Sequence, residues 1–299
     1  MKRNTWILVG ILILLAVATI VVMQRPGEVS SSGSSGKMLV TYDSAAVDKL
    51  EIVSKNSIVT FERQGGKWMM MTSPIRYRAN DAFVAEAVGK GKNLEISSLV
   101  STNPEKQSLF EVDSNGTKVT VYDRGAERAV FFVGKANSSY TDTYVRAAGS
   151  NEVHAASGIL TSTFVRRLED WRDKTVFKAE QSGIASARFT FGDTTFTLAM
   201  RDSAWWIGKD SANQTTVQSF LGSLANVQAD EFVDSAIADL PQLAAAIEVN
   251  GVQIRFYPTK DGSKFFVQTS ESLQWYVLQS WRVNQLLKRK KDFLPAGKS

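Results

Sequence analysis

One uninterrupted apolar run near the N-terminus constrains this chain more than any other feature of its sequence. Residues 6–23 read WILVGILILLAVATIVVM and contain no charged side chain. As a helix, this run would extend about 27 Å at a rise of about 1.5 Å per residue, which is close to the thickness of a bilayer's hydrocarbon core. The run therefore predicts a single transmembrane helix over residues 6–23, after a short tail at residues 1–5.

A cleaved secretory signal and a buried core helix are the two alternatives for this run. The apolar region of a signal is typically about 7–15 residues long and ends at a pair of small residues that mark the cleavage site. Ala16 and Ala18 form such a pair, but the apolar run continues past them to Met23. The chain has no cysteine and therefore no acylation site of the lipoprotein type. These features favour an anchor that stays attached to the protein.

The residues on either side of the run predict its orientation. Lys2 and Arg3 precede it, and positively charged residues favour the cytoplasmic side of a transmembrane helix. Residues 24–37 follow it and are rich in Gly and Ser, a composition typical of a flexible linker. We therefore expect a single-pass protein of the bacterial inner membrane, with a cytoplasmic N-terminus and a body in the periplasm.

The body, residues 38–299, has the composition of a water-soluble globular protein. Its length is large for one domain and suits two. The absence of cysteine excludes disulfides, thiolate zinc sites and thiol catalysis. The net charge of +5 is modest, and no basic and aromatic motif points to nucleic acid. The body must therefore be stabilised by the burial of apolar side chains.

An internal repeat is visible in the opening segments of the body. Residues 47–68 and residues 184–205 both alternate apolar and polar side chains, which indicates half-buried strands. Both segments end at a tryptophan, Trp68 in the first and Trp205 in the second. Because these two tryptophans hold equivalent positions, we expect both to pack in a core.

The repeat continues beyond these strands. Asn80 and Asn213 each precede an apolar helical pattern, and asparagine is among the most favourable N-cap residues. Later strands correspond in three pairs: residues 118–122 with 253–257, residues 129–133 with 264–267, and residues 143–146 with 275–277. Apolar residues at near-helical spacing then predict a closing helix in each half, over residues 160–171 and 283–293.

The order of these elements predicts the fold class. Strands are grouped rather than alternating with helices, which favours an α+β fold with antiparallel sheets. We therefore expect a duplicated antiparallel-sheet-plus-helix module, with a first α+β repeat at residues 38–178 and a second at residues 179–299. Such modules either pack side by side or share one extended sheet, and both arrangements fit the sequence.

Four segments of the body share their pattern with a known family: residues 47–68, 76–93, 143–146 and 164–174. With the N-terminal anchor, they resemble domain of unknown function 4340. The resemblance covers most of the body, and its motifs are structural, including Asp170-Trp171. Members of this family often accompany gliding-motility-type ABC transporters as auxiliary proteins. The resemblance therefore implies an accessory of an envelope transporter, and it implies no catalytic residue.

Few residues of the body suggest nucleophilic catalysis or metal binding. His154 is the only histidine, and no Gly-x-Ser-x-Gly motif accompanies it, so we expect a strand or surface residue. One histidine without cysteine is too few for a typical zinc site, and no acidic segment has the spacing of a calcium loop. The sequence therefore predicts no metal site and no cofactor.

The adjacent carboxylates Glu169 and Asp170 do not form a catalytic pair, because neighbours on a helix point about 100° apart. We expect them to cap the helix or to pair with the nearby arginines, Arg166, Arg167 and Arg172. Two carboxylates from distant segments could still meet in space, as glycosidases require. The sequence nevertheless favours a protein that is not an enzyme.

Two groups of residues are candidates for contacts with a partner. The first group contains the tryptophans most suited to an exposed position, where they could stack on a flat sugar face: Trp206, Trp275 and Trp281. The second group is a basic run near the C-terminus: Lys288, Arg289, Lys290 and Lys291. Such a run is typical of a solvated helix end, and it also suits anionic lipid headgroups or an acidic partner.

The anchor and the lack of catalytic motifs favour a non-enzymatic role. We expect a membrane-anchored extracytoplasmic interaction or scaffold protein, held in the bilayer by residues 6–23. Its expected partner is a membrane protein, such as a subunit of an ABC-type transporter or of an envelope motility complex. The alternatives are a module that binds cell-wall glycan or a solute through exposed aromatic residues, and a hydrolase with dispersed carboxylates.

Overall fold

The computed structural model describes residues 36–72, 75–235 and 237–295. The predicted tail, the predicted transmembrane helix at residues 6–23 and most of the predicted linker lie outside these ranges. Within the described residues, no helix is both long enough and apolar enough to cross a membrane. Lys37, which the prediction assigned to the linker, pairs with a neighbouring strand.

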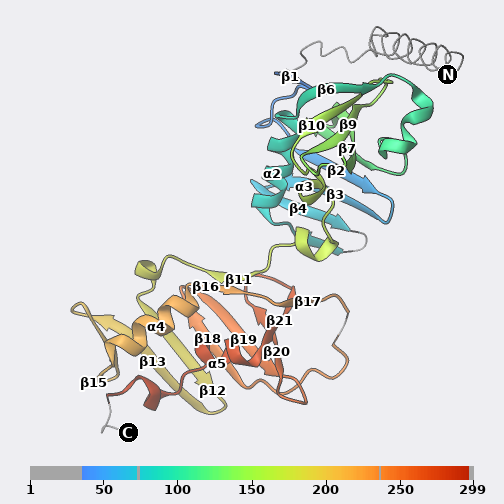
Figure 1. Cartoon of the computed structure of the whole chain (residues 1–299). Helices are drawn as coiled ribbons and strands as arrows, with labels where there is room; N and C mark the ends of the chain where they lie inside the picture. The colour runs from blue at the N-terminus through green and yellow to red at the C-terminus, as the bar shows by residue number, and fades with distance from the viewer. Residues whose placement is uncertain (1–35, 73–74, 236, 296–299) are drawn as a thin grey trace, which may run out of the picture. The chain divides into compact units, whose positions relative to one another are not determined.

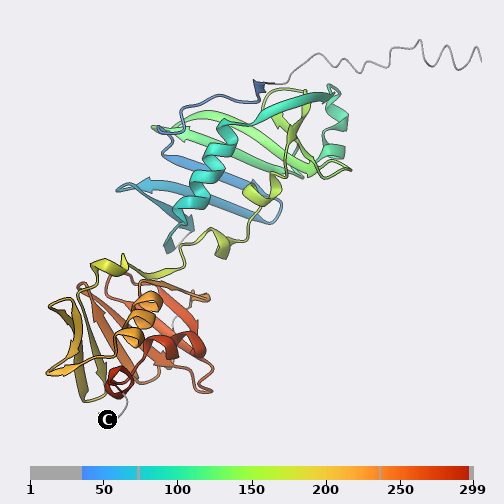
Figure 2. The same cartoon turned by 60° about the vertical axis from the view of Figure 1, so that its left-hand side comes forward.

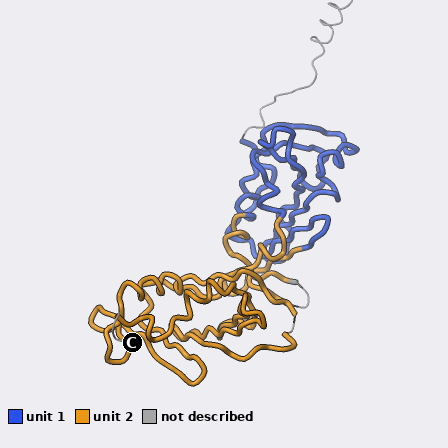
Figure 3. The backbone as a smooth tube through the Cα atoms, turned by 60° about the horizontal axis from the view of Figure 1, so that its bottom comes forward, with its two compact units in different colours: residues 1–58, 87–165 blue, residues 59–86, 166–299 orange. Residues whose placement is uncertain are grey.

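The chain divides into two compact units, each built from two stretches of sequence (Figure 3). The first unit takes residues up to 58 and residues 87–165, and the second takes residues 59–86 and 166–299. The described residues form mostly antiparallel sheets with a few helices, which confirms the predicted α+β class.

Ten strands from the first half of the chain form one sheet (Figure 1). They are β1 (Lys37–Met38), β2 (Lys49–Ser54), β3 (Ser57–Gln64), β4 (Lys67–Thr72), β5 (Ile75–Arg78), β6 (Glu95–Ser101), β7 (Thr117–Asp123), β8 (Ala126–Ala136), β9 (Asp142–Ala147) and β10 (Val153–Ser157). Their order is β1-β6-β10-β9-β8-β7-β2-β3-β4-β5. Two short 3-10 helices, η1 (Pro104–Lys106) and η2 (Ser108–Phe110), connect β6 to β7.

Helix α2 (Asp81–Lys92) crosses one face of this sheet (Figure 2). The Asn80 side chain caps it as predicted, because its oxygen accepts two backbone N–H bonds of the first turn at 3.1 and 3.3 Å. Gly91 allows close packing, since a Cβ there would lie 2.5 Å from the Tyr42 hydroxyl and 3.0 Å from the Phe131 ring. The sheet-facing side chains of the helix are buried: Val84, Ala87 and Val88.

Nine strands from the second half of the chain form another sheet. They are β12 (Ser186–Phe191), β13 (Thr194–Arg201), β14 (Ala204–Ile207), β15 (Asp210–Ser211), β17 (Glu231–Val233), β18 (Ala245–Val249), β19 (Val252–Pro258), β20 (Lys264–Thr269) and β21 (Trp275–Gln279). Their order is β15-β14-β13-β12-β18-β19-β20-β21-β17. A separate two-stranded sheet pairs β11 (Thr175–Lys178) with β16 (Asn226–Gln228), and the 3-10 helix η4 (Gln181–Gly183) precedes β12.

Helices α4 (Gln214–Leu224) and α5 (Ser280–Leu286) cover one face of the nine-stranded sheet (Figure 2). Asn213 caps α4 as predicted and accepts the backbone N–H of Thr216 at 3.1 Å. The sheet residues under the helices come from alternate strand positions and are fully buried, as Phe189 and its partner Ile247 show. The predicted core position of Trp205 is confirmed, because only 1% of it is exposed.

The strand orders correct the sequence correspondences among the later strands. In the ten-stranded sheet β7 lies beside β2, whereas in the nine-stranded sheet β18 lies beside β12. If β2 corresponds to β12, as predicted, the strand orders match residues 118–122 in β7 with residues 245–249 in β18, and not with residues 253–257 in β19. The match was displaced by one strand because all these strands alternate apolar and polar side chains, and periodicity alone does not identify a neighbour.

The prediction of one closing helix in each half is also wrong. Residues 160–171 form α3 (Thr161–Phe164) and the 3-10 helix η3 (Leu168–Trp171), and residues 283–293 form part of α5 and the 3-10 helix η5 (Lys290–Phe293). Arg166 lies in the first interruption, with its guanidinium 4.1 Å from the Phe83 ring and 2.8 Å from the Glu86 carboxylate of α2. Tertiary contacts of this kind override a helical periodicity.

Candidate functional site

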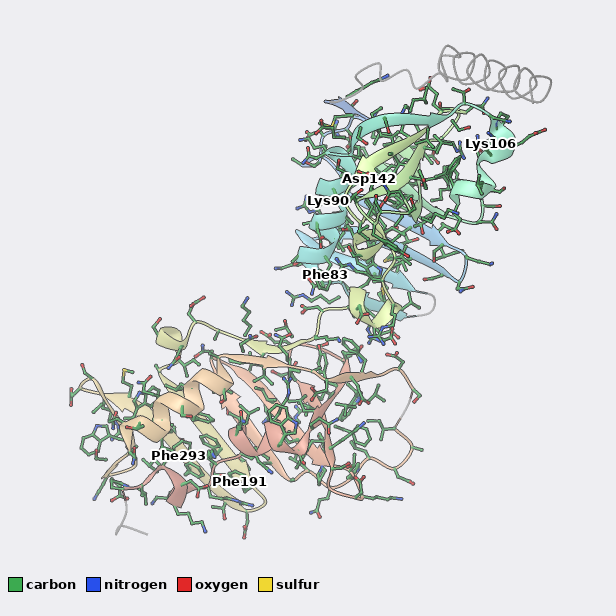
Figure 4. All side chains as sticks on the ribbon, viewed as in Figure 1. Phe83, Lys90, Lys106, Asp142, Phe191 and Phe293 are labelled. Carbon is green, nitrogen blue, oxygen red and sulfur yellow. The ribbon has the colours of Figure 1, made fainter. Side chains whose placement is uncertain are left out.

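The C-terminal segment from α5 to η5 brings together five of the predicted interaction residues. Val283 and Leu286 of α5 are buried against the sheet. Phe293 of η5 is fully buried, with its ring centroid 5.3 Å from that of Phe220 in α4. Phe191 and Phe293 lie at the same end of this unit (Figure 4). These apolar anchors hold the polar stretch between the two helices in place on the surface.

Trp281 is the most exposed of the tryptophans that the sequence singled out, with 58% of its surface accessible. The guanidinium carbon of Arg282 lies 5.0 Å from the centre of the Trp281 ring. Arg282 is itself held by Asp230, at 3.3 Å, and by the carbonyl oxygen of Gln228, at 3.5 Å. Tryptophan and arginine are enriched in protein–protein interfaces, so an exposed tryptophan beside a fixed arginine is typical of such a surface.

The basic run is only partly neutralised by neighbouring groups. Arg289 stacks on the Phe191 ring, with 3.9 Å between its guanidinium carbon and the ring centre. The Lys290 ammonium lies 3.7 Å from the Asp210 carboxylate. Within the described part of the chain, Lys290 is the one member of the run that forms an ion pair, and Lys288, Arg289 and Lys291 form none. The segment that carries Trp281 therefore also carries three cations that no carboxylate neutralises.

Trp206 and Trp275 lie on the face of the nine-stranded sheet opposite the helices. Residues that pair directly across antiparallel strands have side chains on the same face of the sheet. The successive pairings from β14 to β21 therefore place Trp206 and Trp275 on the same face, opposite the helices. Because six strand spacings of about 4.8 Å separate β14 from β21, the two tryptophans are about 29 Å apart along the sheet. They therefore do not bind the same sugar ring.

Trp275 belongs to a small aromatic group on this open face. Its ring lies 5.4 Å from that of Tyr257 in an edge-to-face arrangement, and Tyr257 pairs across the strands with Phe266. All three side chains are half-buried. The structure therefore places Trp275 among other aromatic residues and leaves Trp206 at a distance from them.

Arg172 forms the most extensive polar cluster of the second unit. Only 4% of it is exposed, and its guanidinium donates to both oxygens of Asp234, at 2.8 and 2.9 Å, and to Gln274, at 2.7 Å. The rings of Tyr77 and Phe232 each lie 3.7 Å from the guanidinium carbon. Burial, and then the charge of Asp234, raise the pKa of the Tyr77 hydroxyl above its ordinary value. Both terminal nitrogens donate hydrogen bonds, and only the buried Nε lacks a partner among the described residues, so the cluster is a structural clamp.

Local sequence reasoning did not find this clamp. It expected the arginines near residue 170 to pair with the adjacent carboxylates, and this is correct for Arg167, which donates to both oxygens of Asp170 at 2.9 and 3.1 Å. It is wrong for Arg172, whose partners lie 62 and 102 residues later in the chain. No local pattern signals contacts over such separations.

His154 lies in strand β10, as expected, but it is buried rather than on the surface. Its Nε2 is 3.2 Å from a Glu152 oxygen, and its Nδ1 has no hydrogen-bond partner among the described residues. Both residues border a hollow of about 70 Å³, with Lys37 and Ser150 also on its wall. No group of three or more His, Asp or Glu side chains suited to a metal ion occurs in the described residues.

The comparison with protein families gives one match. The model of a domain of unknown function, DUF4340, matches residues 68–245. No curated protein and no solved structure matches the chain. The matched residues run from β4 to the first residue of β18 and include Arg172 and its partner Asp234. Because the match covers more than half of the chain, the protein belongs to the DUF4340 family.

Proposed function

We propose that this protein is a non-enzymatic interaction subunit of the bacterial envelope. Residues 6–23 would anchor it in the inner membrane, and its body would bind, from the periplasmic side, a membrane protein of an ABC-type transporter or motility complex. The observation that best supports this role is Trp281, which is 58% exposed and lies against the fixed Arg282. Burial of such a residue in a partner's pocket is the usual source of a binding hot spot.

The charges of the C-terminal segment that carries Trp281 indicate the chemistry of the partner surface. Lys288 and Lys291 belong to the same C-terminal segment as Trp281. A complementary surface would have an apolar pocket for the indole and carboxylates around it. An anchor would also keep the body close to a partner in the same membrane and so raise its effective concentration.

We also infer that the body consists of a duplicated module. The support comes from the two strand orders, which match position by position when β1, which has no counterpart, is left out: β5-β4-β3-β2-β7-β8-β9-β10-β6 and β15-β14-β13-β12-β18-β19-β20-β21-β17. The helices also hold equivalent places, since α2 follows β5 and α4 follows β15. This correspondence includes the one-strand correction described above.

Repeated hydrogen bonds at the helix starts support the same inference. The backbone N–H of Asn80 donates to the carbonyl of Trp171 at 2.8 Å, and that of Asn213 donates to the carbonyl of Phe293 at 2.7 Å. The N–H of Trp68 donates to the Asp81 side chain at 2.9 Å, and that of Trp205 donates to the Gln214 side chain at 3.0 Å. Two helix starts that share both of these contacts are simplest to explain by a common ancestor.

The proposed function is tested by purification of the full-length protein from membranes in mild detergent, followed by mass spectrometry. We expect wild type to retain subunits of a membrane complex and Trp281→Ala to lose most of them. Leu273→Ala is the matched control, because Leu273 is 93% exposed in the same unit and no partner role is assigned to it. Recovery of the same membrane proteins with Trp281→Ala, or of none with wild type, would contradict the proposal.

Binding of cell-wall glycan is a second candidate function, and the aromatic group around Trp275 favours it. Aromatic faces stack on sugar rings, and Trp275 and Tyr257 are both partly accessible. The full-length protein should then sediment with isolated cell wall, and Trp275→Ala should abolish this. Trp206→Ala is the control, because Trp206 lies six strands away from Trp275. Equal sedimentation of all three proteins would exclude this surface as the glycan site.

A further inference from the structure

Arg255 lies beside the aromatic group around Trp275, on the open face of the nine-stranded sheet. It precedes Tyr257 by two residues in β19, so both side chains point to this face. In β20, Gln268 pairs with Arg255 and Phe266 pairs with Tyr257. The neighbouring strands β19, β20 and β21 therefore bring one arginine together with three aromatic rings.

The guanidinium of Arg255 is held in place but is not neutralised. Arg255 is half-buried, and its Nε donates to the side-chain oxygen of Gln253 at 2.7 Å. Among the described residues, its two terminal nitrogens donate no hydrogen bond and no carboxylate pairs with it. Glu248 lies on the same face, but its direct partner across the strands is Gln253. Both terminal nitrogens of Arg255 are therefore available to an anion.

The other arginines at similar or deeper burial in the second unit all have a carboxylate partner. Three ion pairs show this, with distances of 2.8, 2.8 and 3.3 Å: Arg166 with Glu86, Arg172 with Asp234 and Arg282 with Asp230. A guanidinium that has lost part of its hydration without gaining a carboxylate raises the free energy of the folded protein. Binding of a carboxylate from outside the chain would offset this cost at Arg255.

We propose that the open face around Trp275 binds a sugar that carries a carboxylate, with the carboxylate on Arg255 and the sugar ring against the aromatic group. The proposal rests on the second candidate function, glycan binding, and names the class of glycan. Aromatic faces suit the apolar side of a sugar ring, and a guanidinium binds a carboxylate through two parallel N–H bonds.

Two further polar groups at this surface suit the hydroxyls of a sugar. The Tyr257 hydroxyl and the Gln268 amide form no hydrogen bond within the described part of the chain. A hydroxyl and an amide both donate and accept, as sugar hydroxyls do. An acidic peptide would satisfy Arg255 as well, but it would not use the aromatic rings as a sugar ring does.

The experiment measures the affinity of the full-length protein, in mild detergent, for trigalacturonate by isothermal titration calorimetry. Two other probes separate charge from shape. The neutral trisaccharide obtained by reduction of the carboxylates keeps the rings without the charge, and triglutamate carries carboxylates without sugar rings. We expect trigalacturonate to bind at least about tenfold more tightly than either probe, as hydrogen bonds to a charged group allow.

Single substitutions assign the effect to residues. Arg255→Gln should lower the affinity for trigalacturonate at least about tenfold and leave that for the neutral trisaccharide unchanged, which also shows that the variant is folded. Trp275→Ala should weaken the binding of both sugars. Arg201→Gln is the matched control, because it removes the same charge from an exposed arginine on the same face, three strands away.

Three results would overturn the proposal: equal affinity for the charged and the neutral sugar, a loss with Arg255→Gln no larger than with Arg201→Gln, or triglutamate binding as tight as that of trigalacturonate. The first two leave glycan binding itself intact, because Trp275 still contacts a sugar. Binding of neither sugar would also overturn the proposal, and sedimentation with isolated cell wall then shows separately whether glycan binding fails too.

Discussion

Asp261 stabilises the hairpin turn between β19 and β20. The hydroxyls of Thr259 and Ser263 donate to its carboxylate at 2.6 and 2.8 Å, and the backbone N–H of Ser263 donates at 3.1 Å. These bonds, led by that from Thr259, lower the pKa of Asp261 from 3.8 to about 2. The contribution to stability is therefore complete above the unfolded value of 3.8 and is lost as the pH falls through about 2.

We expect Asp261→Asn to reduce the loss of unfolding free energy between about pH 4 and pH 2. The asparagine cannot release or bind a proton, so it removes this source of pH dependence. Urea unfolding at a series of pH values measures the effect, with the exposed Asp239→Asn as the control. The same acid dependence in wild type and Asp261→Asn would show that the turn carboxylate does not contribute.

The turn between β13 and β14 contains backbone strain that the turn between β3 and β4 avoids. Asp202 and Ser203 have φ values of 48° and 64°, whereas Gly65 and Gly66, in the turn between β3 and β4, have 56° and 81°. A left-handed backbone conformation costs a residue with a Cβ roughly 1–2 kcal/mol. Glycine avoids this cost, but part of the gain is lost because glycine has more conformational freedom in the unfolded chain. We expect Ser203→Gly to raise the unfolding free energy by about 0.5–1 kcal/mol and Gly66→Ser to lower it similarly, as measured in urea.

At the scale of elements, the clamp around Arg172 and the pair formed by Arg167 have similar geometry but different burial. Arg172 is 4% exposed at its side chain and Arg167 is 74% exposed. Removing the carboxylate from a buried arginine leaves an unpaired charge, which costs about 3 kcal/mol, whereas an exposed pair contributes about 1 kcal/mol or less. Because Asp234 is itself 54% exposed, we expect Asp234→Asn to lower the unfolding free energy by less than this, about 2 kcal/mol, and Asp170→Asn by less than about 1 kcal/mol. Equal losses in chemical denaturation would mean that burial does not decide the strength of the clamp.

The elements that could be predicted from sequence are those defined by short-range contacts. The caps at Asn80 and Asn213 depend on N–H groups within three residues, so a local pattern identifies them. The strand neighbours depend on contacts across the sheet, and alternation in several similar strands led to a shift by one strand. Arg172 was missed for the same reason, because its partners are distant in sequence. The candidate surface around Trp281 was predicted only as a list of residues, since exposure depends on the packing of α5.

At the scale of the whole molecule, the boundaries of the family match do not coincide with those of the sheets. The match begins at Trp68, inside β4, and ends at Ala245, the first residue of β18. It therefore omits β1, β2 and β3 from one sheet and β19, β20 and β21 from the other. Each omission removes buried residues from a core, such as Phe61 in the first case and Phe256 in the second.

We therefore expect the fragment 68–245 not to fold, whereas the fragment 174–299 should fold by itself. The second fragment keeps all nine strands of its sheet together with α4 and α5, so it retains the apolar core that these elements share. In urea it should unfold in one cooperative transition, and the fragment 68–245 should show no such transition and should bind a hydrophobic dye. Cooperative unfolding of the fragment 68–245 would mean that stability does not depend on complete sheets. Loss of structure in the fragment 174–299 would mean that this sheet needs residues 59–86, which belong to the same compact unit.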